Sequence, residues 1–156
     1  MGVSGTISNF NFPASMTVSP ETTHLSNQHF KLCIRRESGY CSICYAPFSS
    51  GSEPDVEFTF GLSAAASPTE IGCLTDYLVI PAGVDTKMDG DLEATDMSNA
   101  QRICGIAFSI DEPTSVSICS RSAPFFVEFK SDGDEAPLEE NGSVGFSLNY
   151  QQMVCP

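Results

Sequence analysis

The feature that most constrains how this chain can fold is a repeated alternation of apolar and polar residues with a period of two. In Val144–Tyr150, for example, apolar residues fall at every second position. Successive side chains of a β-strand point to opposite faces of the sheet, so this pattern predicts a strand that buries one face. The same alternation predicts further strands in Asn27–Arg36, Tyr40–Tyr45, Val56–Leu62 and Pro124–Lys130.

Turn-forming residues separate the predicted strands at intervals of roughly 8–12 residues, which is the spacing of β-sandwiches and barrels. The uninterrupted apolar run Tyr77–Ile80 is consistent with a central strand, and no segment shows a sustained helical stripe. We therefore expect one all-β domain over residues 1–156, built as an antiparallel sandwich. The side chains expected in its core are Phe30, Leu32, Ile34, Ile43, Phe58, Phe60, Tyr77, Val79, Phe129, Phe146 and Leu148.

Charge narrows the partners that such a domain can have. The chain has 20 acidic and 7 basic residues, for a formal net charge of −13. Nucleic acids and anionic membranes would repel it, because binding to their phosphates depends on lysine and arginine. No apolar run approaches the ~20 residues that a membrane span needs. An acidic excess suits solubility, a basic partner or a divalent cation.

Seven widely spread cysteines indicate disulfides formed in an oxidising, extracellular compartment. The single C-x-x-C at Cys41–Cys44 lacks the second pair or nearby histidines of a structural zinc site, since His24 and His29 both lie upstream. The odd count leaves a free thiol, an intermolecular bridge, or a partner cysteine outside this sequence. The first residues lack the features of a signal peptide, so we expect a domain excised from a longer secreted protein. Asn141 begins an N-x-[ST] glycosylation motif in a polar turn.

Residues suited to catalysis do not form any recognisable set. Cys44 with His24 or His29 is the one thiol–imidazole combination worth considering, and no acid completes it. The serine-hydrolase pattern G-x-S-x-G is absent from the sequence. Carboxylates are abundant, but they gather in polar loops such as Asp132–Asn141, where solvation is the default. We therefore expect a protein without enzymatic activity.

Four short motifs resemble, in order, those of CUB domains. Cys73–Gly83 resembles the family's C-x-x-D-Y segment, and Arg102–Gly105 resembles its R-x-C-G. Further on, Phe129–Asp132 resembles F-x-S-D, and Gly145–Tyr150 resembles the terminal G-F-x-(apolar)-x-Y strand. Within Leu25–Cys41 the sequence is similar to CUB-like domains of arthropod extracellular proteins. The resemblance implies a jelly-roll-like β-sandwich, secreted and non-catalytic, that recognises protein or glycan partners.

The resemblance also implies one of the disulfides, because the family joins the cysteines of C-x-x-D-Y and R-x-C-G. No cysteine precedes Cys33 to form the family's first pair, and Cys33 and Cys41 flank the predicted tight turn Glu37-Ser38-Gly39. These two cysteines are therefore expected to pair across a hairpin. The predicted bridges are Cys33–Cys41, Cys73–Cys104 and Cys119–Cys155, with Cys44 unpaired.

Many CUB domains bind calcium, so the resemblance implies candidate ligands. Asp76 and Asp132 match the acidic positions of C-x-x-D-Y and F-x-S-D, and Glu70 is the expected third carboxylate, with Glu57 as its alternative. Calcium prefers oxygen ligands that converge from several loops. We expect Ca²⁺ to tie down this acidic end and to present it to a basic side chain of a partner.

Two functions from different classes remain open. The first is an extracellular binding module that recognises a protein or glycan partner. The alternative is a structural or assembly component of an extracellular matrix, cuticle or secretion, in which the odd cysteine links copies into a homo-oligomer.

Overall fold

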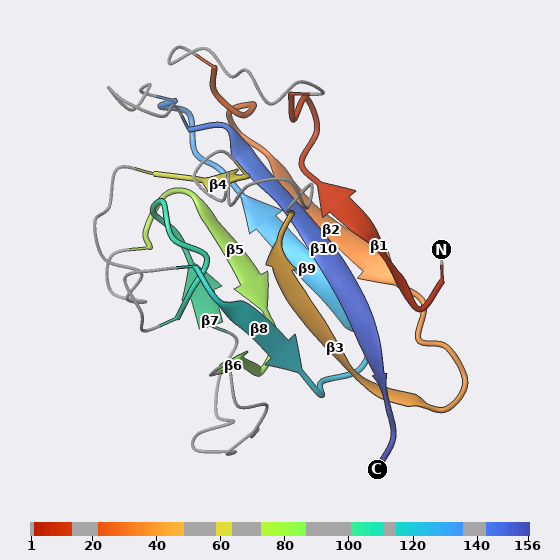
Figure 1. The fold of residues 1–156 in the computed structure, drawn as a ribbon. Coiled ribbons are helices and arrows are strands. Elements are labelled where there is room, and N and C mark those ends of the chain that lie inside the picture. The colour runs from red at the N-terminus through yellow and green to blue at the C-terminus, as the bar shows by residue number, and fades with distance from the viewer. Residues whose placement is uncertain are drawn as a thin grey trace.

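The computed structural model describes residues 2–13, 22–48, 59–63, 73–86, 101–110, 115–135 and 143–156. All regular secondary structure in these ranges is β-strand, which confirms the predicted all-β fold. The strands form two antiparallel sheets (Figure 1), so the predicted sandwich is also confirmed. Within the same ranges, no helix has the length and apolar character needed to cross a membrane.

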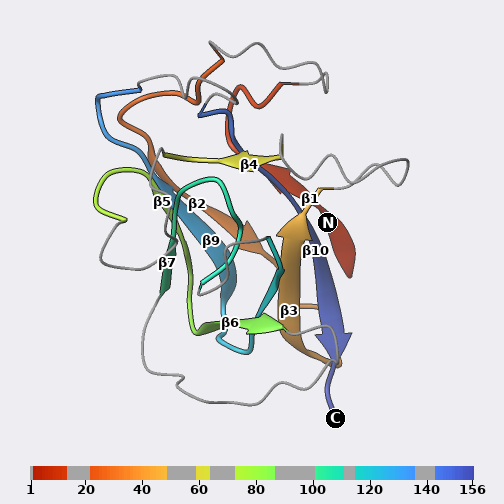
Figure 2. The same cartoon turned by 60° about the vertical axis from the view of Figure 1, so that its left-hand side comes forward.

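The first sheet is built around the long strand β10 and its neighbour β3. In order, its strands are β1 (Ser4–Ser8), β10 (Gly145–Val154), β3 (Tyr40–Pro47), β8 (Ser117–Ser120) and β6 (Gly83–Thr86), with β4 (Phe60–Gly61) also pairing with β10. The second sheet has the order β2 (His29–Ile34), β9 (Phe125–Lys130), β5 (Tyr77–Ile80) and β7 (Gln101–Ile103). Figure 2 shows the two layers, with β2, β9, β5 and β7 on one side and β1, β10 and β3 on the other.

Strand β9 shows how the alternating sequence produces a sandwich. Phe125, Val127 and Phe129 are buried, whereas Phe126 and Glu128 between them are only half-buried on the opposite face. A slip of one residue in the pairing would expose all three buried side chains to water. The pattern therefore fixes which face of the strand lies against the first sheet.

Strand β5 departs from the predicted core. Leu78 and Ile80 are fully buried in the main core, whereas the predicted Tyr77 and Val79 lie on the other face. There they pack in a smaller cluster with Cys73–Cys104. Because all four residues of β5 are apolar, alternation could not decide which pair points to the main core.

The rest of the predicted core agrees with the structure in most positions. Phe30 and Leu32 are only half-buried because β2 is an edge strand, although both pack against the main core. Phe58 lies outside the described residues. The predicted core residues that are buried in the main core are Ile34, Ile43, Phe60, Phe129, Phe146 and Leu148.

The disulfides confirm one predicted bridge and correct the others. Cys73–Cys104 forms as predicted, and the remaining bonds are Cys41–Cys155 and Cys44–Cys119. The predicted Cys119–Cys155 bridge is wrong because β3 separates β8 from β10. Cys44 of β3 lies directly opposite Cys119 of β8, and the N–H of Cys155 donates to the carbonyl of Gly39, beside the start of β3. The two cysteines of β3 thus bond to different neighbours: Cys41 to Cys155, which follows β10, and Cys44 to Cys119 of β8.

The predicted Cys33–Cys41 bridge is also wrong, and Cys33 rather than Cys44 is the free, exposed cysteine. The turn at Gly39 does not close a hairpin, because β2 and β3 belong to different sheets. Cys33 instead lies opposite Phe126 of β9.

A buried glutamine fixes this crossing between the sheets. Gln152 of β10 donates from its side-chain amide to the Arg35 carbonyl and accepts from the Glu37 N–H, both at 3.0 Å. Because a buried backbone group without a partner is costly, these bonds hold the connection in place.

Candidate functional site

Three segments that are distant in the sequence meet at one end of the sandwich. Residues 22–28 precede β2, residues 73–76 precede β5, and residues 131–135 follow β9. The first and last run side by side at the top of Figure 2, where the N–H of Asn27 donates to the carbonyl of Asp132 at 2.5 Å. Loop side chains from all three segments therefore gather in one cluster.

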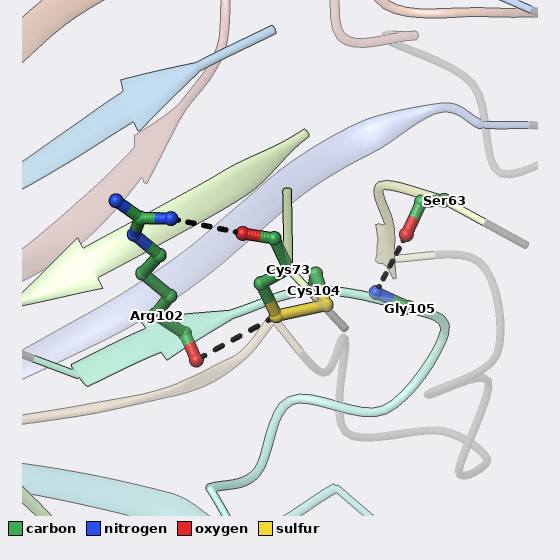
Figure 3. Close-up of a disulfide and its surroundings, with 5 residues drawn as sticks. All are labelled: Ser63, Cys73, Arg102, Cys104 and Gly105. Carbon is green, nitrogen blue, oxygen red and sulfur yellow. Dashed lines mark hydrogen bonds between the residues drawn. A yellow bond between two sulfur atoms is a disulfide. The ribbon is translucent and has the colours of Figure 1, made fainter. Parts of the chain in front are cut away.

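The Cys73–Cys104 disulfide (Figure 3) anchors the start of the segment that precedes β5. Asp76 lies in this segment. The Arg102 guanidinium donates to the carbonyl of Cys73 at 3.2 Å. On the other side of the bond, the N–H of Gly105 donates to the hydroxyl of Ser63 at 3.1 Å. These contacts fasten both ends of the disulfide, so the position of Asp76 is tied to the second sheet.

The structure brings two of the predicted metal ligands together. The Oδ1 atom of Asp76 accepts the backbone N–H of Asp132 at 2.9 Å, and the Oδ1 atom of Asp132 accepts the N–H of Asp134 at 2.8 Å. Asp76 is buried, whereas Asp132 is half-buried and Asp134 is exposed. The other predicted ligand, Glu70, and its alternative Glu57 lie outside the described residues.

His24 and Glu135 belong to this cluster and are absent from the predicted ligand set. Nδ1 of His24 lies 3.0 Å from Oε2 of Glu135, and the His24 side chain is fully buried. One ligand atom from each of His24, Asp76 and Glu135 lies within 4.8 Å of the others. Glu135 shares the acidic loop of Asp132, so the sequence offered a signal for it. His24 has no such signal, since only the fold brings residues 22–28 to this loop.

Packing and backbone contacts hold His24 in place. Its ring meets the ring of Phe129 edge-on, with centroids 5.4 Å apart. The backbone N–H of His24 donates to the carbonyl of Ser143 at 2.6 Å. The imidazole is therefore fixed from the core side and from the chain that leads into β10.

The carboxylates of the cluster disfavour one another's charge. The pKa of Glu135 is raised to about 7, mainly by burial; the charge of His24 lowers it, and the carboxylates of Asp76, Asp132 and Asp134 add to the increase. Burial also raises the pKa of Asp76, against lowering effects that include the hydrogen bond from Asp132 and the charge of His24. Together these directions describe a cluster of carboxylates whose charged forms a cation would stabilise.

The sequence model of the animal CUB domain matches residues 1–153. This chain belongs to the animal CUB domain family. Among solved structures, it is similar to the CUB1-EGF-CUB2 domain of human MASP-1/3, with a TM-score of 0.52 at 17% identity. The match covers 99% of this chain and 43% of that chain, so the chain spans less than half the length of that protein. No curated protein matches the sequence. CUB domains are generally extracellular protein-interaction modules.

Among the described residues of this CUB domain, the converging ligand atoms are not all oxygen. Calcium takes six to eight oxygen ligands, whereas the converging atoms include an imidazole nitrogen of His24. The predicted ligand Asp132 does not join the group of converging atoms among the described residues. Its Oδ1 atom, like that of Asp76, accepts a backbone N–H.

The outer face of the second sheet has a contrasting charge pattern. Lys31 lies over the ring of Phe126, 4.7 Å from its centroid, and its ammonium is 3.1 Å from Glu128. Glu128 also meets the exposed His29 at 2.5 Å, and hydrogen bonds from His29 and Lys31 lower its pKa. The free thiol of Cys33 is exposed on the same strand as Lys31. This face therefore offers paired charges and a thiol rather than a cluster of carboxylates.

Proposed function

We propose that this CUB domain is a non-catalytic extracellular module that recognises a protein or glycan partner, and that a protein partner places a basic side chain at the acidic end of the domain. The single observation behind the proposal is the concentration of carboxylates from Asp76, Asp132, Asp134 and Glu135 at one end of the sandwich. Together they make this end negative, and the field of such a cluster attracts a lysine or arginine of a partner.

Burial differs across this cluster. Asp76 is buried and the Glu135 side chain is only 11% exposed, whereas Asp132 is half-buried and Asp134 is exposed next to the exposed Gly133. Asp134, with the accessible part of Asp132, is therefore the part that a partner can touch without displacing the fold. Rim charges of this kind raise association rates and select for an oppositely charged partner.

A selection from a displayed random-peptide library tests this proposal. The enriched peptides are expected to contain lysine or arginine, and Asp132→Asn with Asp134→Asn is expected to weaken their binding about tenfold, or roughly 1.4 kcal/mol. The matched control is Glu37→Gln with Glu128→Gln, which removes the same charge elsewhere and should leave affinity nearly unchanged. Enriched peptides without basic residues, or equal losses in both double variants, would contradict the proposal.

The exposed thiol of Cys33 favours a second candidate function in assembly. Cys33 lies on the edge strand β2, where nothing in the described sheet shields its outer side. In this function, a bridge between two Cys33 residues links copies of the chain in an extracellular matrix, cuticle or secretion. On a non-reducing gel, assembly predicts a dimer band that disappears with reductant and with Cys33→Ser. A monomer under oxidising conditions would leave recognition as the better explanation.

Three more specific statements about this domain are predictions. Secretion and glycosylation at Asn141 follow from the extracellular assignment, and Asn141 lies outside the described residues. A closer relation to arthropod CUB-like domains rests on the motif within Leu25–Cys41. Calcium binding by Asp76 and Asp132 with Glu70 stays a prediction, and the metal titration below measures it.

A further inference from the structure

We propose that His24, Asp76 and Glu135 form a binding site for one divalent transition-metal ion of the Zn²⁺ class. The inference goes beyond partner recognition and stands independently of it, because the metal alone is the probe. It rests on three side chains of suitable chemistry whose ligand atoms already lie within 4.8 Å of one another.

The first step concerns the two ring nitrogens of His24. Nε2 lies 3.3 Å from the carbonyl oxygen of Leu62. Nδ1 faces the carbonyl oxygen of Leu25 at 3.4 Å and Oε2 of Glu135 at 3.0 Å. A neutral imidazole has a single N–H, yet both nitrogens here face oxygen acceptors. With the proton on Nε2, the lone pair of Nδ1 points at oxygen atoms, and a cation between them would turn this repulsion into attraction.

The contact between Leu62 and Nε2 has a second consequence. A histidine that binds a metal commonly donates its other ring N–H to a carbonyl or carboxylate, which fixes the tautomer and the ring orientation. Leu62 is in position to accept that bond. Nδ1 of His24 is then the nitrogen available to the ion.

The second step concerns Glu135. Both of its carboxylate oxygens are buried and have no hydrogen-bond partner among the described residues. A buried carboxylate without donors is costly unless it is paired or coordinates a metal. Its contact with His24 does not have the geometry of a hydrogen bond, so a bound ion would supply the partner that the described residues do not.

The third step is the choice of ion. One imidazole nitrogen and two carboxylates suit zinc and related ions, whereas calcium and magnesium prefer oxygen alone. Around a tetrahedral Zn²⁺ the ligand atoms lie roughly 3.3 Å apart, so the outermost pair here would close by roughly 1.5 Å or less. Three protein ligands also leave a fourth position open. A water molecule or a further ligand could occupy that position.

Calorimetric titration of the whole domain with Zn²⁺ alone, and separately with Ca²⁺ alone, tests the site. We expect one Zn²⁺ per chain, bound at least about tenfold more tightly than Ca²⁺, together with a rise in melting temperature. Glu135→Gln and Asp76→Asn preserve side-chain shape and are each expected to weaken Zn²⁺ binding by about tenfold or more. His24→Gln tests the nitrogen directly, and its melting curve without metal shows whether the variant folds.

Two controls separate this site from other zinc ligands on the chain. His29→Gln alters the exposed histidine that contacts Glu128 and should leave Zn²⁺ affinity unchanged. Cys33→Ser removes the free thiol and should also leave it unchanged. Titration with Co²⁺ adds a spectroscopic readout, because loss of the visible absorption in Glu135→Gln but not in His29→Gln locates the ion.

Several results would overturn the inference. One is the absence of Zn²⁺ binding heat in the folded domain. Another is tighter binding of Ca²⁺ than of Zn²⁺, which would return the site to the oxygen ligands predicted from the sequence. A loss of Zn²⁺ affinity in His29→Gln or Cys33→Ser as large as that in Glu135→Gln would place the ion elsewhere. Loss of peptide binding alone would contradict the proposed partner recognition but not the metal site, because the two are measured separately.

Discussion

Replacing both Cys41 and Cys155 by serine is expected to lower the free energy of unfolding by about 2–5 kcal/mol. The bond joins residues separated by 114 positions, the longest span of the three disulfides. A cross-link over a longer loop removes more conformational freedom from the unfolded chain, so this bond should stabilise the domain most. It also fastens the end of β10 to the start of β3. Urea denaturation with linear extrapolation measures the change.

Cys33→Ser is the matched control for this experiment. Its thiol is free and exposed, so the free energy of unfolding should change by no more than about 0.5 kcal/mol. If Cys33 instead paired with Cys41, the Cys33→Ser and Cys41→Ser variants would lose similar stability. Peptide mapping without reductant provides the independent check, because it should recover the Cys41–Cys155 fragment.

The strands were the most predictable part of the fold, because the cause lies within each segment. In β9, the inward direction of Phe129 follows from alternation with its polar neighbours Glu128 and Lys130. In β5, both faces are apolar, so the alternation does not favour Leu78 over Tyr77 for the main core. The second face of β5 is buried only because the loop with the Cys73–Cys104 bond covers it. That covering depends on tertiary structure.

The disulfide pairing could not be read from spacing because it depends on strand order. Gly39 does adopt the left-handed conformation expected of a tight turn, with φ of 85°. Turn chemistry predicts that the chain reverses direction, but it does not say whether the strands on either side share a sheet. Here they enter different sheets, which separates Cys33 from Cys41 and leaves Cys41 beside Cys155. Only the family motif, which spans Cys73 and Cys104, contained non-local information.

Part of the candidate site could be predicted from motifs in the sequence, and the rest depends on the fold. The contact between Asp76 and Asp132 followed from two motifs of the CUB pattern. His24 lies in neither motif, and it reaches Glu135 because residues 22–28 bind along the loop after β9. From the sequence, His24 had only a cysteine as a conceivable partner. In the structure, Cys44 is bonded to Cys119, and His24 contacts Glu135 instead.

Phe129→Ala is expected to have the largest effect of any single substitution proposed for this domain, a loss of about 3–5 kcal/mol in the free energy of unfolding. The side chain is fully buried, and its ring centroid lies 5.4 Å from that of Phe30 and 5.5 Å from that of Phe146. It therefore joins both sheets, and truncation would leave a cavity between them. Because the same ring packs against His24, truncation should also weaken Zn²⁺ binding in any fraction that still folds.

Phe126→Ala is the control on the same strand. Its ring is half-buried on the outer face beneath Lys31, so the expected loss is about 1 kcal/mol. Phe129→Leu keeps most of the apolar volume and should fold with a loss of about 1.5 kcal/mol or less, which keeps the comparison measurable if the alanine variant does not fold. Equal losses in Phe126→Ala and Phe129→Ala would mean that β9 does not bury one face as the structure shows. A loss of stability in Phe129→Ala but not in Phe126→Ala would show that β9 places the Phe129 ring between the sheets. There it packs against the imidazole of the proposed metal site.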